Sequence, residues 1–490
     1  MFRKAINKYK ILPIQVRASL WFLVCSFLQK GISTLTTPVF TRLLDTAEYG
    51  QYIAFSSWLE ILTIFVCLQL SAGVYQQALI KFENERDILS SSLQGLTLTL
   101  CCAWTVIYAA FHHFWNALFS LTTAQMLAML LMIWTTAVFN FWAAEQRVKL
   151  TYQRLVLLTI AVSLAKPILG ILLVTHTEAQ YKVTVRVLGI ALVELIAYFG
   201  LFVIQMKRGK QFFHARFWKY ALLFNLPLIP HYLSQTVLSS ADRIMIRDMV
   251  GESEAGIYGL AYSLSMIMVL FNTALSQTLG PWMYQKIKVR REGDIARVAY
   301  GGLLLVAAVN LLLIAVAPEA VAIFAPKDYH NAIWVIPPVA MSVYFMFAYD
   351  LFAKFEFYYE KTRFIMAASI AAAALNLLLN YIFIRIFGYY AAGYTTLFCY
   401  MIYTAGHYVF MRKVCRTHMA GAKVYDLRIL LGITMGFLML GFVLLFTYNY
   451  SYVRYAFLGA ALLAILINAK RLLRLAKALL EKRNAAGKQQ

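Results

Sequence analysis

The sequence predicts an all-α protein that crosses a membrane many times. Of its 490 residues, 61% are hydrophobic and only 14% are charged, whereas about a quarter of the residues in a soluble chain are charged. Apolar runs of 18 or more residues recur along the chain, and each is long enough to cross the hydrocarbon core of a bilayer as a helix. An internal repeat of 206 residues further predicts two copies of a six-helix unit.

Fourteen transmembrane helices are predicted from these apolar runs. They lie near residues 18–41, 49–73, 91–113, 121–144, 152–175, 184–205, 219–241, 256–279, 296–318, 331–353, 364–386, 389–411, 427–447 and 452–469. The connections between them are short, so none holds a globular domain. We expect an N-terminal six-helix bundle (1–205), a cytoplasmic linker (206–220), a C-terminal six-helix bundle (221–413), two extra transmembrane helices (414–469) and a basic cytoplasmic tail (470–490).

The first half of the chain recurs in the second half at a constant offset. Without gaps, an offset of 206 places Gln29 on Gln235, Ser33 on Ser239, Thr34 on Ser240, Glu48 on Glu254, Gly50 on Gly256, Tyr52 on Tyr258 and Phe65 on Phe271. Matches that share one register indicate an internal duplication. Because each copy holds an even number of spans, a pseudo-twofold axis along the membrane normal relates the two bundles. They are expected to form a V around a cavity that opens to one side at a time.

The basic residues indicate how the chain is oriented. If the N-terminus is cytoplasmic, 35 of the 45 Lys and Arg residues fall in cytoplasmic segments and 8 in external loops. This is the positive-inside bias. It explains the net charge of +23 by a cationic face apposed to anionic lipid, without nucleic acid. We expect both termini in the cytoplasm, an uncleaved first span, and a C-terminal tail that lies on the inner leaflet as an amphipathic helix.

The sequence predicts no metal site and no cofactor. Its six cysteines lack zinc-ligand spacing, most of them lie within apolar runs, and buried free thiols are the simplest interpretation. There is no GxxxxGK[ST] motif for nucleotide phosphates.

Polar residues inside the predicted spans are the best indication of a functional site. Ser26, Lys30, Ser33, Thr37 and Thr41 recur at helical spacing and share one face of the first span. A charge at the centre of a membrane helix costs about 2.5–3.5 kcal/mol on insertion scales. This face is therefore expected to look into protein or a water-filled cavity, and Lys166, just before Pro167, is expected to do the same.

Further polar residues are expected around the same cavity. Within the spans of the first half they are Glu60 and Glu194, with Arg42, Asp45 and Glu48 at the outer mouth. In the second half His231, Gln235, Ser239 and Asp242 share one face of a proline-containing span and Arg243 follows. Simpler interpretations stay open, because carboxylates and His231 can bond neighbouring helices and arginines at the mouth can be interfacial loop charges.

One phrase of the sequence resembles a known family. Arg42, Leu44, Glu48, Tyr49, Gly50 and Tyr52 form an R-x-L-x-x-x-E-Y-G-x-Y pattern, and the second copy keeps Glu254, Gly256 and Tyr258. The chain is similar here to the polysaccharide, or O-antigen, flippases of the multidrug/oligosaccharidyl-lipid/polysaccharide exporter superfamily. The resemblance implies a transporter, not an enzyme, in a bacterial inner membrane. It implies export of undecaprenyl-diphosphate-linked oligosaccharide from the inner to the outer leaflet, for O-antigen, capsule or exopolysaccharide, beside a polysaccharide polymerase and a chain-length regulator.

Site roles follow from the chemistry of such a cargo. The diphosphate is expected to bind cations, and hydroxyl and amide groups are expected to hydrogen-bond it and the sugars. Substrate-binding residues are expected to be Lys30, Lys166, Arg42, Arg243, Ser33, Gln235 and Ser239. Ion coupling, by a proton or sodium, or gating is expected at Glu60, Glu194, Asp242, His231, Asp45 and Glu48.

Three other functions remain in view. The two extra C-terminal spans resemble those of the lipid II flippases in the same superfamily. A cation-coupled drug exporter would need acidic residues to dominate the cavity, and the lysines count against it. A membrane polysaccharide polymerase or ligase would have a large external loop, whereas external loops here hold about a dozen residues or fewer.

Overall fold

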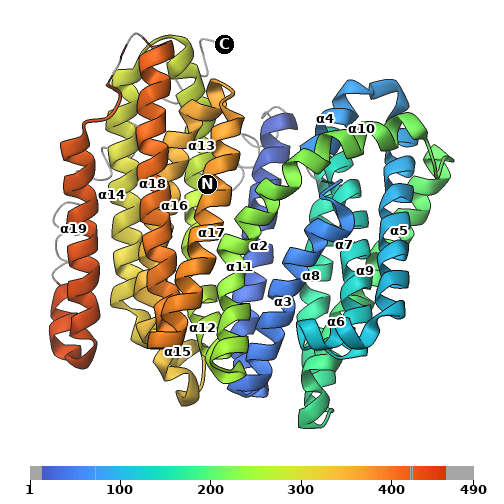
Figure 1. The fold of residues 1–490 in the computed structure, drawn as a ribbon, viewed down its shortest axis with the longest axis horizontal. Coiled ribbons are helices and arrows are strands. Elements are labelled where there is room, and N and C mark those ends of the chain that lie inside the picture. The colour runs from blue at the N-terminus through green and yellow to red at the C-terminus, as the bar shows by residue number, and fades with distance from the viewer. Residues whose placement is uncertain (1–13, 72, 420, 422, 460–490) are drawn as a thin grey trace, which may run out of the picture.

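The computed structural model describes residues 14–71, 73–419, 421 and 423–459, and within these ranges every regular element is a helix (Figure 1). The long helices are α2 (Ile14–Leu43), α3 (Thr46–Cys67), α5 (Arg86–Ala110), α7 (Thr123–Val148), α8 (Tyr152–Thr175), α9 (Lys182–Gly209), α11 (Ile229–Met249), α12 (Glu252–Ser265), α13 (Ile267–Lys288), α14 (Glu292–Ala315), α16 (Ile336–Tyr358), α17 (Thr362–Phe387), α18 (Tyr390–His418) and α19 (Leu427–Phe446). Shorter helices are α4 (Gly73–Lys81), α6 (His112–Phe119), α10 (Ala215–Asn225) and α15 (Ala317–Phe324). The 3-10 turns are η1 (Glu83–Glu85), η2 (Ala179–Tyr181), η3 (Leu226–Leu228), η4 (Lys327–Trp334) and η5 (Thr447–Asn449).

The chain is a multi-pass membrane protein. Among the described residues, ten helical segments are long and apolar enough to cross a bilayer. Helices α2, α11 and α18 are also long, but they are not among the ten, and the first two carry the polar residues that the sequence places inside spans. The predicted spans as far as residue 447 each overlap a helix. Most of the fourteenth (452–469) and the predicted tail (470–490) lie outside the described residues.

Two predicted spans are broken in the structure. The span predicted at 219–241 consists of α10 and α11, separated by a 3-10 turn that contains Pro227, with Pro230 in the first turn of α11. Proline lacks a backbone N–H and its ring clashes with the preceding turn, so it interrupts an α-helix. The span predicted at 256–279 is divided between α12 and α13, next to Met266.

The helices form two groups that meet along central helices. Figure 1 shows α4 to α10 on one side of the molecule and α13 to α19 on the other. Between them, α3 packs against α11 and α12, and α2 packs against α8. These central helices carry the polar stripes that the sequence predicts, so the fold places the stripes at the boundary between the two groups.

The contact between α3 and α12 is reciprocal. A Cβ atom on Gly50 would lie 1.8 Å from the backbone oxygen of Glu252, and one on Gly256 would lie 2.1 Å from that of Thr46. At the offset of 206, Thr46 corresponds to Glu252 and Gly50 to Gly256, so exchanging the halves maps the contact onto itself. This is what a pseudo-twofold relation requires. Glycine is needed because no side chain fits where the backbones approach this closely.

Further hydrogen bonds hold the same end of the molecule together. Ser253 Oγ donates to Thr46 Oγ1 at 2.7 Å, and Gln51 Nε2 donates to Glu252 Oε2 at 2.7 Å. The Tyr329 hydroxyl donates to the backbone oxygen of Asp45 at 3.0 Å. Contacts between the two halves therefore close this end.

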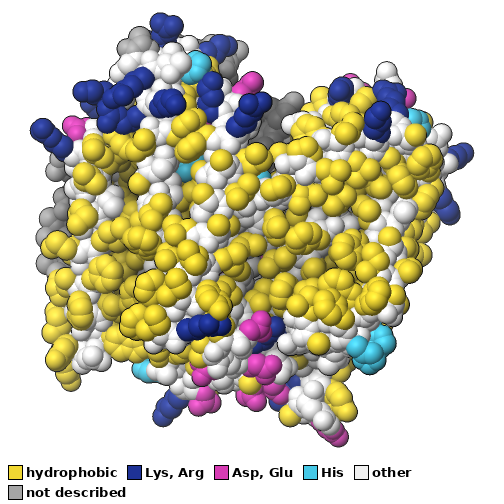
Figure 2. Space-filling model, in the orientation of Figure 1, with side chains coloured by type: hydrophobic (Ala, Val, Ile, Leu, Met, Phe, Trp, Pro, Cys, Tyr) yellow, Lys and Arg dark blue, Asp and Glu magenta, His cyan; other side chains and the backbone are white. Residues whose placement is uncertain are grey.

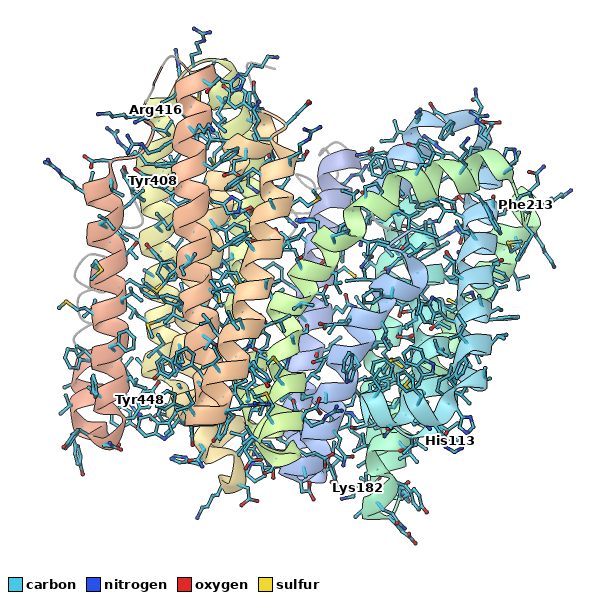
Figure 3. The ribbon with its side chains drawn as sticks, viewed as in Figure 1. His113, Lys182, Phe213, Tyr408, Arg416 and Tyr448 are labelled. Carbon is cyan, nitrogen blue, oxygen red and sulfur yellow. The ribbon has the colours of Figure 1, made fainter. Side chains whose placement is uncertain are left out.

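The two ends of the molecule carry opposite charges. Figure 2 shows Lys and Arg gathered at one end, where the outline is hollowed between the two helix groups, and Asp and Glu gathered at the other. Arg416 lies at the basic end, and Lys182 lies at the opposite end beside the closed contact (Figure 3). The closed contact is thus at the acidic end, opposite the end where Lys and Arg gather.

Candidate functional site

A cavity of about 410 Å³ lies within the helices of the first half. Its lining comes from α2, α3, α7, α8 and α9, and only Ser263, Leu264 and Phe324 belong to the second half. The sequence predicts a cavity between the two bundles, whereas this cavity lies almost entirely within the first. Hydroxyl groups on three helices give the cavity a polar wall: Ser33, Thr34, Thr37, Ser56, Thr159 and Ser163.

Lys166 and Glu194 form an ion pair that faces this cavity. The Lys166 ammonium lies 2.5 Å from Glu194 Oε1. The other carboxylate oxygen, Oε2, accepts hydrogen bonds from the Thr135 hydroxyl at 2.7 Å and the Thr136 hydroxyl at 3.3 Å. Both charged residues line the cavity, and the Glu194 side chain is 4% exposed while that of Lys166 is 30% exposed. The carboxylate is thus fixed by three donors. The ammonium remains accessible to an anion that competes with the Glu194 carboxylate for it.

Lys30 is the second lysine of the cavity. No hydrogen bond or ion pair joins its ammonium to another described residue, and it lines the cavity with Ser33 from the same helix. Glu60 and Arg243 are the charged groups near enough to act on it electrostatically. The structure therefore brings Lys30, Ser33, Lys166 and Glu194 to one cavity, and it leaves the Lys30 ammonium without a direct partner.

Glu60, Asp242 and Arg243 lie at the boundary between the halves and do not line the cavity. The Ser240 hydroxyl donates to Glu60 Oε2 at 2.5 Å and accepts from Arg243 Nη2 at 2.9 Å, which connects α3 with α11. Asp242 is 1% exposed, and it accepts a hydrogen bond from the Tyr258 hydroxyl. These groups bond mainly to one another, although Arg243 Nε is buried without a hydrogen-bond partner in the described residues. Their predicted roles in coupling and substrate binding stay predictions.

Gln235, Ser239 and His231 are also outside the cavity lining. Gln235 Nε2 donates to the Ser369 hydroxyl on α17 at 2.9 Å, and Ser239 Oγ donates to a backbone oxygen within α11 at 3.1 Å. Nδ1 of His231 is buried and has no partner among the described residues. The polar face of α11 is thus largely used in packing against α17 and α3, which the sequence pattern alone does not reveal.

The residues predicted at the outer mouth have structural contacts. Arg42 Nη2 donates to the Ile323 backbone oxygen at 3.0 Å, which connects α2 with the end of α15. Asp45 caps α3: its Oδ1 accepts from the Glu48 backbone N–H at 2.7 Å, and Glu48 Oε2 accepts from the Asp45 N–H at 2.9 Å. This is a capping box. A gating role for these residues stays a prediction.

Asp45→Ala and Asp45→Ser separate a capping role from a gating role. A lost N-cap costs about 1 kcal/mol of stability, and serine caps nearly as well as aspartate. We expect Asp45→Ala to lower the melting temperature of the purified protein and Asp45→Ser to leave it nearly unchanged. If Asp45→Ser folds normally but abolishes transport, the carboxylate has a role beyond capping.

Sequence reasoning missed two kinds of functional group. Arg186 lies at the start of the span predicted at 184–205 and is one of the eight basic residues counted as external. In the structure α9 begins at Lys182 and places Arg186 a turn inside the helix, where it lines the cavity. Thr135 and Thr136 lie inside a predicted span, and their adjacent hydroxyls were a signal that could have indicated a buried acceptor.

A fully buried pair of ionisable residues was also missed. His407 Nδ1 lies 2.8 Å from Glu356 Oε2, and both side chains are 0% exposed. The pair joins α16 to α18, and it lies among the second-half helices, away from the cavity lining. The span boundaries near 353 and 411 hid it, because they placed Glu356 in a loop and His407 at the end of a helix.

Comparisons with known proteins define the class first. The fold is that of the multidrug/oligosaccharidyl-lipid/polysaccharide exporter superfamily, whose members are transporters and not enzymes. The model of the family described as "Polysaccharide biosynthesis protein" matches residues 16–287, and a MatE family model matches residues 227–382. The first match covers more than half of the chain, so this chain belongs to the polysaccharide biosynthesis protein family, and the resemblance seen in the sequence is confirmed.

Individual relatives are distant in sequence. An uncharacterized membrane protein of Haemophilus influenzae is 20% identical over 383 residues, which cover 74% of this chain and 88% of that protein. The "Lsg locus putative protein 1" of the same organism is 26% identical over 205 residues, 39% of this chain and 49% of that protein.

Solved structures share the fold. The lipid II flippase MurJ in an inward closed conformation superposes with a TM-score of 0.70 at 13% identity. The match covers 92% of this chain and 100% of the MurJ chain. A multidrug resistance MATE transporter in an outward-facing conformation superposes with a TM-score of 0.57 at 13% identity. The match covers 85% of this chain and 99% of the transporter chain.

Proposed function

We propose that this chain is a flippase for a polyprenyl-diphosphate-linked oligosaccharide in the assembly of a surface polysaccharide. The cargo moves from the inner to the outer leaflet of a bacterial inner membrane, and both chain termini are cytoplasmic. The proposed layout has fourteen transmembrane helices, two bundles of six and two extra. The observation that carries the proposal is that Lys30 and Lys166 line one hydroxyl-rich cavity in a membrane protein.

The chemistry of the cavity suits a diphosphate-linked glycan. Lipid excludes the anionic head, and an ammonium group holds phosphate as a point charge without imposing a fixed geometry. Lys30 has no direct partner in the described structure, and Lys166 can exchange its Glu194 carboxylate for a phosphate oxygen. The hydroxyls of Ser33 and Ser163 provide hydrogen bonds to phosphate and sugar.

Release of Glu194 gives the site a means of coupling. When phosphate takes Lys166, the Glu194 carboxylate keeps its hydrogen bonds from Thr135 and Thr136 but loses its cation. The freed carboxylate is then available to a coupling cation, a proton or sodium. The inside-negative potential favours outward movement of an anion by about 2.3 kcal/mol per charge per 100 mV.

Two engineered cysteines test the proposed orientation. Gln180 is exposed in the η2 turn at the acidic end, and Lys288 is exposed at the end of α13. In a cysteine-free background, a membrane-impermeant thiol reagent should label Gln180→Cys in intact cells and Lys288→Cys only after lysis. The reverse pattern would invert the topology.

Deletion of the protein in its native host tests the function. We expect surface polysaccharide to be lost and lipid-linked oligosaccharide to accumulate, with normal peptidoglycan synthesis and unchanged drug sensitivity. Arrest of peptidoglycan synthesis would instead indicate a lipid II flippase, and increased drug sensitivity alone would indicate a drug exporter. Polymeric glycan that is lost from the surface while single repeat units still reach it would indicate a polymerase or ligase.

A further inference from the structure

Arg186 is a cavity residue that aromatic side chains hold in place. It lies near the outer end of α9 and is 7% exposed. Its guanidinium carbon lies 3.6 Å from the ring centroid of Phe40 on α2 and 3.5 Å from that of Tyr52 on α3. Cation–π contacts of this kind occupy the faces of the guanidinium and leave its N–H groups free to donate hydrogen bonds.

Two of the three guanidinium nitrogens of Arg186 lack acceptors among the described residues. Nε and Nη1 are buried and have no hydrogen-bond partner in the described part of the chain. No described carboxylate forms an ion pair with Arg186, although the side chain remains protonated at any physiological pH. A buried, permanently charged group that is not neutralised is costly, and inside a membrane such a group marks a functional site. The group that completes it is an anion that enters the cavity, and guanidinium groups match phosphate oxygens especially well.

Arg186 lies at a different depth from the two lysines. On α9 it is eight residues nearer the outer end than Glu194, the partner of Lys166, which is about 12 Å at 1.5 Å per residue. On α2, Phe40 is ten residues nearer the outer end than Lys30, which is about 15 Å. The cavity therefore has cations at two levels, an inner one with Lys30 and Lys166 and an outer one with Arg186.

We propose that Arg186 forms a second anion-binding site, which receives the diphosphate of the cargo after the Lys30 and Lys166 site and before release to the outer leaflet. This rests on the proposed function. The two rings that hold Arg186 come from α2 and α3, and α3 also makes the glycine contact that closes the outer end. Binding of an anion at Arg186 therefore acts on the helices that must separate when the cavity opens outward.

Arg186→Met and Arg186→Lys test this proposal. Methionine keeps much of the apolar bulk without the charge, whereas lysine keeps the charge without the planar fork. At equal protein in the membrane, we expect Arg186→Met to lower surface glycan at least tenfold and Arg186→Lys to retain at least a third of it. Arg385 is the control, because it is exposed and stacks 3.9 Å from the ring centroid of Tyr381 outside the cavity, and Arg385→Met should export normally.

Binding of farnesyl diphosphate to the purified protein provides the second measurement. Arg186→Met should bind it with a Kd within threefold of the wild type, because the inner site is intact, whereas Lys30→Ala should bind it at least tenfold more weakly. Normal export by Arg186→Met overturns the proposal. An equal loss of export and of thermal stability in both Arg186 variants also overturns it, and so does a Kd of Arg186→Met for farnesyl diphosphate that is more than threefold that of the wild type. If the wild type binds no farnesyl diphosphate and its deletion leaves surface glycan intact, the proposed function itself fails and this inference falls with it.

Discussion

Lys30→Ala is expected to reduce surface glycan by about 10- to 150-fold while leaving normal amounts of protein in the membrane. The ammonium lines the cavity and has no direct partner among the described residues, so its removal breaks no ion pair that stabilises the fold. A hydrogen bond to a charged group contributes about 1.5–3 kcal/mol, and this range corresponds to the stated loss. The measurement is surface glycan in a deletion strain complemented with the variant, normalised to membrane protein.

Lys30→Arg and Lys288→Ala are the matched variants for this prediction. Arginine preserves the charge at position 30 and should retain part of the export. Lys288 is exposed at the basic end of the molecule, outside the cavity lining, and its substitution should change nothing. Normal glycan display by Lys30→Ala would remove Lys30 from the site, even if the chain remains a flippase.

Gly50→Ala is expected to prevent the outer end from closing. Its Cβ atom would lie 1.8 Å from the backbone oxygen of Glu252, and a backbone atom cannot move aside without displacing α12. Overpacking of this kind costs about 1–3 kcal/mol. We expect the strain to be relieved when α3 and α12 separate, which would shift the equilibrium towards the state open at this end by about 5- to 150-fold. Cysteine at position 253, inside the contact, should then react faster with an impermeant reagent from the outer side.

Gly200→Ala serves as the control for Gly50→Ala. Gly200 lies on α9, and a Cβ atom there would meet nothing within 4 Å. Alanine at this position should leave labelling and export unchanged. Gly256→Ala should reproduce the effect of Gly50→Ala, because its Cβ atom would lie 2.1 Å from the Thr46 backbone oxygen. Unchanged labelling in both glycine variants would show that this contact does not control the outer end.

The helices could be predicted because membrane insertion dominates the sequence pattern. Long apolar runs have few alternatives to a helix in lipid. The offset of 206 residues paired Gly50 with Gly256, but the contact of each glycine with the backbone of the other half was found only in the structure. The two prolines of the span at 219–241 indicated a bend there, and the structure has a 3-10 turn at Pro227. The break beside Met266 was not predicted, because an apolar run continues across it.

Only part of the candidate site could be predicted, because helix packing decides which polar faces line a cavity. Lys30 and Lys166 were identified because charges at membrane depth are costly, and both line the cavity. The same reasoning could not distinguish a polar face that lines a cavity from one that is used between helices, as at Gln235 and Ser240. Arg186 was missed because it lies at the very start of the span predicted at 184–205, where span boundaries are uncertain by several residues.

The most direct test of the account is the accessibility of position 33 in inverted membrane vesicles. Ser33 lines the cavity beside Lys30. In a cysteine-free background, Ser33→Cys should react with an impermeant thiol reagent added at the cytoplasmic face, and farnesyl diphosphate should slow the reaction while farnesol should not. A cysteine at this position that does not react, or that farnesyl diphosphate fails to protect, would contradict a water-filled, anion-binding cavity.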